Sequence, residues 1–181
     1  MGTDKASLEV AGRPLIEHAV ALARSVTGDV RIVGDPAKFA GFAETIPDVF
    51  PGQGPLGGIH AALSASDCDC NLILGVDLPF VEARFLNFLV SKAQRETATV
   101  TVPHTAGHFQ TLCAVYRKPF VGVAARALEE GRNKIDALFL EIAVNVISEQ
   151  ELTAAGFLPA MFRNLNTPGD LEMARREFHS R

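Results

Sequence analysis

Residues 71–80 read Asn-Leu-Ile-Leu-Gly-Val-Asp-Leu-Pro-Phe, and this stretch decides the fold of the chain. Its apolar run, Leu72, Ile73 and Leu74, is too short for a helix and is typical of a strand buried on both faces of a parallel sheet. Asp77 follows this strand, and Pro79 stops the ladder from continuing. Because open α/β sheets bind ligands at the carboxyl ends of their strands, we expect Asp77 to face a crevice.

From this segment alone, Asp77 has two interpretations. Mg²⁺ prefers one or two carboxylates together with substrate phosphates, so an aspartate at this place is suited to hold a metal on a nucleotide. Alternatively, Asp77 caps the turn before Pro79, as aspartate often does.

Outward from this strand, strand-like and helix-like segments alternate. Short apolar or β-branched runs predict further strands at 8–10, 30–33, 45–48, 97–102, 110–116 and 143–147. Helical spacing or helix-start signals predict helices at 14–25, 59–66, 82–94, 119–130 and 136–141, and another that begins after Thr167. The pattern predicts an α/β three-layer α/β/α sandwich with a mostly parallel, Rossmann-like sheet and an inserted hairpin.

Composition narrows the class of protein. A chain of 181 residues with 48% hydrophobic and 21% charged residues is expected to form one domain (1–181) with a real core. The net charge of −4 gives no basic surface for nucleic acid. The three cysteines lack the spacing of a zinc or redox site, so we expect reduced thiols. With no signal core and no run of transmembrane length, a cytoplasmic protein without membrane contact is expected.

Residues 49–58, Val-Phe-Pro-Gly-Gln-Gly-Pro-Leu-Gly-Gly, are the second informative stretch. Glycines let backbone approach a ligand, and a helix start directly after them makes an anion or nucleotide site. A plain tight loop is the competing interpretation.

Four segments together resemble the molybdenum cofactor guanylyltransferases, which have the sugar-nucleotidyltransferase-like fold. They are Met1-Gly-Thr-Asp-Lys5, Gly54-Pro-Leu-Gly-Gly58, Gly75-Val-Asp-Leu-Pro79 and Asn164-Leu-Asn-Thr-Pro168, in the expected order over essentially the whole chain.

The resemblance implies a Mg²⁺-dependent transfer of GMP from GTP to the terminal phosphate of molybdopterin, with release of pyrophosphate. It implies that Lys5 contacts the nucleotide phosphates and that Asp77 is the metal ligand. By the same resemblance, the nucleoside side is formed by Asp48, Gly54, Pro55, Leu56, Gly57 and Gly58, and the pterin side by Asn164 and Asn166. Other cofactor-biosynthesis proteins and recipient molybdoenzymes are the implied partners.

Two departures from the family pattern stand out. The family normally opens with an apolar strand and a Leu-x-Gly-Gly-x-Ser-x-Arg loop joined to Met-Gly-x-Asp-Lys, whereas this chain starts at that Met-Gly. We therefore expect the natural protein to carry about 15–20 further residues, enough for one strand and its loop. The strand that ends at Gly34 and Asp35 also lacks an asparagine that some members use near the base.

Three alternatives stay open. A cytidylyltransferase that makes the sister cofactor would share fold and metal site, and nucleotide preference separates the two. A sugar- or polyol-phosphate nucleotidyltransferase is disfavoured by the Asn-Leu-Asn-Thr-Pro segment. An inactive module that binds nucleotide or pterin would retain binding without turnover.

Overall fold

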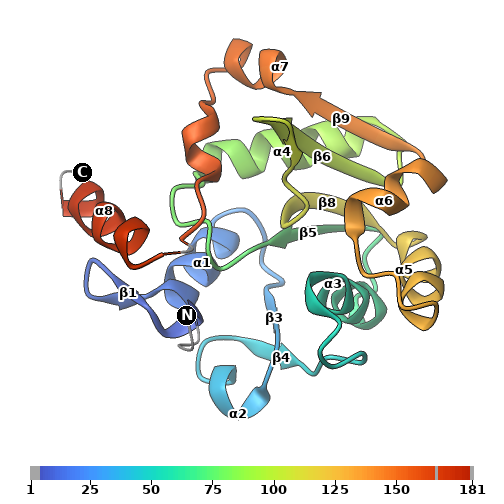
Figure 1. Cartoon of the computed structure of the whole chain (residues 1–181), viewed down its shortest axis with the longest axis horizontal. Helices are drawn as coiled ribbons and strands as arrows, with labels where there is room; N and C mark the ends of the chain where they lie inside the picture. Colours follow the sequence, from blue (N-terminus) through green and yellow to red (C-terminus); the bar gives the residue numbers. More distant parts are fainter. Residues whose placement is uncertain (1–4, 166, 180–181) are drawn as a thin grey trace.

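Strands and helices alternate along the structure, a computed structural model that describes residues 5–165 and 167–179 (Figure 1). The strands are β1 (Glu9–Val10), β2 (Arg13–Pro14), β3 (Arg31–Val33), β4 (Glu44–Ile46), β5 (Cys70–Leu74), β6 (Val100–Thr105), β7 (His108–Phe109), β8 (Cys113–Arg117) and β9 (Val144–Ser148). The helices are α1 (Leu15–Arg24), α2 (Pro36–Phe39), α3 (Gly54–Ala65), α4 (Ala83–Arg95), α5 (Phe120–Glu129), α6 (Ile135–Leu138), α7 (Glu149–Ala154) and α8 (Pro168–His179). Short 3-10 turns are η1 (Lys5–Ser7), η2 (Phe139–Glu141) and η3 (Pro159–Phe162).

The largest sheet has five strands, with β8 between β5 and β6 and with β9 on the other edge of β6. β8 runs antiparallel to both β5 and β6, whereas β9 runs parallel to β6. The predicted mostly parallel sheet is therefore mixed. The reason is that residues 106–107 reverse the chain: Ala106 and Gly107 both have positive φ, which suits a tight hairpin turn.

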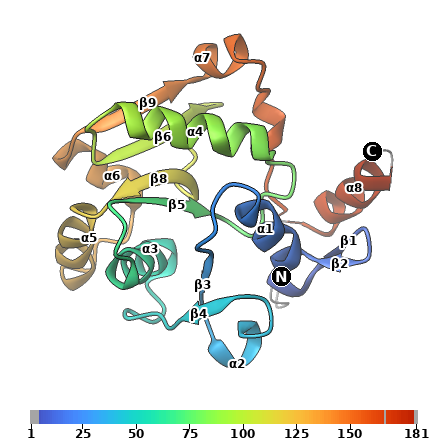
Figure 2. The ribbon, with the colours of Figure 1, turned by 180° about the vertical axis from the view of Figure 1, so that it is seen from behind.

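Helices cover both faces of this sheet, which confirms the predicted α/β class and its layers (Figures 1 and 2). The side chains of β8 show the division, because alternate residues of a strand point to opposite faces. Ala114 and Tyr116 pack with α3 and α5, while Cys113 and Val115 pack with α4. Cys113 is buried, and burial raises the pKa of its thiol to about 12, whereas Cys68 is exposed.

A separate two-stranded sheet, β3 with β4 in parallel, lies beyond β5 and is not hydrogen-bonded to it. The predicted strand at 8–10 also lies outside the main sheet: β1 forms a small antiparallel hairpin with β2. Local alternation predicts that a segment is extended, but it does not say which strand it pairs with.

One helix start differs from the sequence prediction, and another agrees with it. The sequence places the glycine-rich residues 49–58 in a loop and starts the helix at residue 59, but α3 begins at Gly54 and includes Pro55 and both following glycines. Proline is favoured near a helix start because its fixed φ is helical. Its missing N–H costs nothing there, since the first N–H groups of a helix have no partner within the helix. At α8, the predicted Thr167 cap is confirmed: the Asp170 N–H donates to Thr167 Oγ1 at 3.1 Å.

Candidate functional site

Lys5 and Asp77 meet at the carboxyl end of β5. The chain leaves β5 after Leu74 and reaches Asp77 three residues later, while Lys5 opens η1. Lys5 Nζ lies 3.3 Å from Asp77 Oδ2. The Asp77 side chain is 18% exposed and that of Lys5 37%, so the pair is open to an incoming ligand on one side. Two sequence-predicted site residues, 72 positions apart, are thus in contact.

Gly75 makes room for this carboxylate. Its N–H donates to the Leu112 carbonyl oxygen at 2.6 Å, which holds the segment against the start of β8. A Cβ at position 75 would lie 3.0 Å from Asp77 Oδ1 and 3.2 Å from Leu112 Cβ, which is tighter than most Cβ contacts. A larger residue here would require these neighbours to shift.

Asn164 lies beside the Asp77 segment. The N–H of its neighbour Leu165 donates to the Asp77 carbonyl oxygen at 3.1 Å, and Leu165 itself is buried. Arg163 fixes the same stretch: its guanidinium lies 4.3 Å above the Phe80 ring and 2.7 Å from a Glu177 carboxylate oxygen. Asn164 is exposed, whereas Asn166 lies outside the described residues.

Asp48 lies against the first turns of α3. Its Oδ1 accepts the Phe50 N–H at 3.0 Å. A Cβ at Gly57 would lie 3.0 Å from the Phe50 carbonyl oxygen and 3.3 Å from Asp48 Oδ1, so glycine lets the turn and helix approach. No side chain caps the amides at the start of α3. Leu56, in contrast, is fully buried in the core, so only its backbone can face a nucleotide.

His60 is a site neighbour that sequence reasoning missed. It lies one turn after Gly57, is only 8% exposed, and packs edge-on against Phe50 with ring centroids 4.9 Å apart. Its Nε2 lies 3.5 Å from Ser64 Oγ, whereas Nδ1 has no hydrogen-bond partner. Burial lowers the pKa of His60, although the nearby Asp48 charge opposes this. A lone histidine gives no spacing signal that could have placed it here.

A cavity of about 740 Å³ lies between α1, α3, β3 and β5. Ala6, next to Lys5, and Val76, next to Asp77, line it, as do Pro55 and Gly58 of α3. Of the site residues predicted from the sequence, Pro55 and Gly58 line this cavity, whereas Lys5, Asp48 and Asp77 do not.

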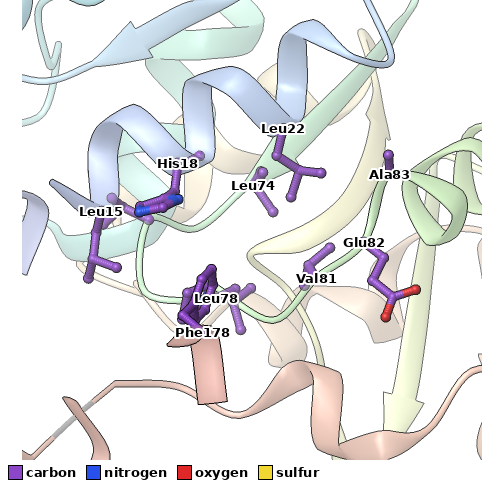
Figure 3. Close-up of a pocket in the computed structure, with 12 residues that line it drawn as sticks. Leu15, His18, Leu22, Leu74, Leu78, Val81, Glu82, Ala83 and Phe178 are labelled. Atoms are coloured by element: carbon purple, nitrogen blue, oxygen red, sulfur yellow. The ribbon is translucent and has the colours of Figure 1, made fainter. Parts of the chain in front are cut away.

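A smaller cavity of about 320 Å³ lies on the far side of the Asp77 segment, between α1, the start of α4 and α8 (Figure 3). Its walls are mostly apolar, with His18 and Glu82 as the polar exceptions. His18 Nε2 lies 2.8 Å from the Val10 carbonyl oxygen, and its ring meets Phe178 edge-on. None of the sequence-predicted site residues lines this cavity.

Within the described residues, no group of three or more histidines, cysteines and acids is arranged to hold a metal. His104 lies in β6 and His108 in β7, on either side of the hairpin turn. The single carboxylate of Asp77 suits Mg²⁺, which needs few protein ligands when phosphates and waters supply the rest. The described helices include none that is long and apolar enough to span a membrane.

A carboxylate and a lysine in contact beyond the carboxyl end of a sheet strand suit the binding of nucleotide phosphates and a metal, as in α/β nucleotide-binding proteins. Residues 1–144 match the family described as MobA-like NTP transferase domain. The chain belongs to this family.

Similar proteins agree with this assignment. The chain is 32% identical to a probable molybdenum cofactor guanylyltransferase of Pelotomaculum thermopropionicum, over 97% of this chain and 85% of that protein. It is 31% identical to the molybdenum cofactor guanylyltransferase of Desulfosudis oleivorans, over 96% and 86%. Among solved structures, molybdopterin-guanine dinucleotide biosynthesis protein A of Archaeoglobus fulgidus matches with a TM-score of 0.85 and 25% identity, over 99% of this chain and 93% of that one.

A fourth similarity concerns the fold alone. The 2-C-methyl-D-erythritol 4-phosphate cytidylyltransferase of Thermus thermophilus matches with a TM-score of 0.72 at 18% identity, over 97% of this chain and 94% of that one. The same α/β architecture thus also occurs in a cytidylyltransferase.

Proposed function

We propose that this chain transfers GMP from GTP to the terminal phosphate of molybdenum-molybdopterin, which gives the guanine dinucleotide form of the cofactor and pyrophosphate. The observation that carries the proposal is the contact of Lys5 Nζ with Asp77 Oδ2, 3.3 Å apart, just beyond the carboxyl end of β5. The names of the relatives at 31–32% identity point to the same reaction.

The reaction needs positioning and charge neutralisation more than covalent help. An oxygen of the terminal molybdopterin phosphate attacks the α-phosphorus of GTP, and the bond from that phosphorus to the bridging oxygen of the β-phosphate breaks. Negative charge grows on the departing pyrophosphate, where the Lys5 ammonium group can stabilise it. Asp77 would hold Mg²⁺, which when bound neutralises further charge on the phosphates.

On the nucleoside side, we assign Asp48 and the Gly54–Gly58 turns of α3. A carboxylate accepts hydrogen bonds from ribose hydroxyls or from the N–H groups of guanine, and uncapped helix amides suit an anionic ligand. On the pterin side, we assign Asn164, which is exposed beside the Asp77 segment, together with Asn166. Their amide groups can both donate and accept.

The test is a nucleotide titration followed by a turnover assay. Calorimetry with GTP, CTP and ATP in the presence of Mg²⁺ should show GTP binding tightest, and pyrophosphate should be released only when molybdopterin is added. Tighter binding of CTP would move the chain to the cytidylyltransferases. Nucleotide binding without any turnover in a form that binds molybdopterin would instead make it a binding module.

Contacts with recipient molybdoenzymes and other cofactor-biosynthesis proteins, and a cytoplasmic location, stay predictions. A pull-down with a purified molybdoenzyme, with and without loaded cofactor, would test the first of these.

A further inference from the structure

Arg163 joins three segments beside the candidate site. Its guanidinium carbon lies 4.3 Å from the centroid of the Phe80 ring, and its Nη2 donates to both carboxylate oxygens of Glu177, each at 2.7 Å. Phe80 follows Asp77 closely in the chain, and Glu177 belongs to α8. Because Arg163 directly precedes Asn164, one side chain connects the pterin-side segment, the metal-side segment and α8.

The neighbour on the other side of Asn164 is tied to the same metal-side segment. The Leu165 N–H donates to the Asp77 carbonyl oxygen at 3.1 Å, and the side chains of Leu165 and Phe80 are buried in one apolar cluster. That cluster also contains residues of α8, which packs beside β1 (Figures 1 and 2). Both neighbours of Asn164 are therefore held on residues 77–80, which fixes the Asn164 backbone relative to Asp77.

This arrangement leaves the Asn164 side chain available for a ligand. The backbone of Arg163 is extended, with φ −67° and ψ 117°, and successive side chains of an extended chain point to opposite sides. Arg163 and Leu165 pack toward Phe80 and its cluster, whereas Asn164 between them is exposed. The side chain that we assign to the pterin thus faces away from the cluster that anchors its backbone.

We propose that Arg163 is a positioning residue for nucleotidyl transfer: it sets the place of Asn164 relative to Asp77, and through them the approach of the acceptor to the nucleotide. The inference rests on the proposed function, which assigns Asp77 to the metal and Asn164 to the pterin. Arg163 acts through the backbone of its neighbour. Its effect on the rate is large because a displacement of about 1 Å in a reacting group can cost about 10²-fold.

Arginine suits this task better than lysine. A planar guanidinium group can lie on an aromatic ring while its N–H groups donate to a carboxylate, whereas an ammonium group is a strongly hydrated point charge. The Phe80 ring is only 3% exposed, so it offers the guanidinium a fixed surface.

A second arginine–phenylalanine stack in the same protein provides a matched control. The Arg84 guanidinium carbon lies 4.5 Å from the centroid of the Phe157 ring, and Arg84 Nη2 donates to the Gly156 carbonyl oxygen at 2.9 Å. This stack joins α4 to the residues that follow α7, and none of its members is assigned to the site. Arg163→Ala and Arg84→Ala therefore remove the same kind of contact at two different places.

The first measurement is amide hydrogen exchange of the ligand-free protein, followed by NMR. In Arg163→Ala, exchange of the Leu165 amide should be about tenfold faster, because its bond to the Asp77 carbonyl oxygen opens more often. Arg84→Ala should leave the exchange of this amide unchanged. Neither GTP nor molybdopterin is needed, so the readout does not depend on the proposed function. Equal exchange of the Leu165 amide in the wild type and in Arg163→Ala would overturn the proposal.

The second measurement separates the two substrates kinetically. Arg163→Ala should lower kcat/KM for molybdopterin about tenfold and change the KM for GTP by less than about twofold, whereas Arg84→Ala should change neither. Arg163→Lys should not restore the rate, because an ammonium group does not bridge the ring and the carboxylate. In an Asn164→Ala background, Arg163→Ala should have little further effect, since the two residues act as one unit.

The outcomes distinguish this inference from the proposed function. A wild-type protein that releases no pyrophosphate with GTP and molybdopterin would refute the proposed function. An active wild type with equal kinetic losses in Arg163→Ala and Arg84→Ala, or with full rescue by Arg163→Lys, would refute the positioning role alone.

Discussion

The candidate site has two carboxylates, Asp77 and Asp48, and each lies against a glycine at which an added Cβ would be crowded. Asp77 has Gly75 beside it at the end of β5, and Asp48 has Gly57 beside it at the start of α3. Their partners differ: Asp77 contacts the Lys5 ammonium group, whereas Asp48 accepts a backbone N–H from Phe50.

The different partners suit the two carboxylates to different roles. The partner of Asp77 is a mobile cation on a flexible stem, which can move to a phosphate and leave the carboxylate for a metal. The partner of Asp48 is fixed in a turn, which holds the carboxylate in one direction. Asp77 is thus suited to charge neutralisation and Asp48 to recognition.

The largest effect is expected from Asp77→Asn. The amide keeps the size and the turn geometry of the side chain but removes the charge that would hold Mg²⁺. Turnover should fall by about 10²–10³-fold, the usual loss for one electrostatic group of a transfer site. Thermal unfolding and steady-state kinetics of the same preparation are the measurements; wild-type turnover would show that Asp77 is only a turn residue.

Gly75→Ala should come next. The added Cβ would lie 3.0 Å from Asp77 Oδ1, so the carboxylate or the Leu112 contact must shift. Overpacking of this kind costs about 1–3 kcal/mol in unfolding free energy, and activity should drop with it. The control is Gly122→Ala on the exposed side of α5, where a Cβ meets nothing within 4 Å. If both variants melt alike, Gly75 is not holding Asp77 in place.

Gly57→Ala should act on nucleotide binding more than on the chemical step. The Cβ would press on the Phe50 carbonyl oxygen at 3.0 Å and move the Asp48 turn. We expect GTP affinity to fall about tenfold, which corresponds to about 1.4 kcal/mol. Gly122→Ala on α5 is the control, since a Cβ there meets nothing within 4 Å and the residue lies outside the proposed site. Equal calorimetric affinities for the two variants would refute a nucleoside role for this turn.

The smallest effect concerns pH. Burial holds the folded-state pKa of His60 below its ordinary value of 6.5, so the unfolded chain takes up a proton first as pH falls. The contribution of His60 to the free energy of unfolding should therefore be constant above pH 6.5. It should decrease as the pH falls from 6.5 to the lowered pKa of the folded state. His60→Phe, which keeps the ring contact with Phe50, should flatten this part of the melting-temperature curve. A curve unchanged by the substitution would exclude His60 as its source.

Local signals predicted much of the fold. The helical spacing of Phe85, Leu86 and Leu89 gave α4 within a residue at each end, because that face packs on the sheet. α7 was missed, although Ser148 three residues before Glu151 is a capping signal: the Ser148 side chain accepts the Glu151 N–H at 3.2 Å. That residues 1–181 form a single domain stays a prediction.

The sequence by itself determined where most helices and strands lie, which motifs carry the family, and that Asp77 follows a strand. These features depend on residues only a few positions apart in the chain, because periodicity, capping and turn formation are local. Only the tertiary structure decided that β8 lies between β5 and β6, that α3 begins at its glycines, and that Lys5 meets Asp77. It alone separated β3 from β5, since strand pairing depends on backbone groups far apart in the chain, and side-chain patterns do not specify a partner.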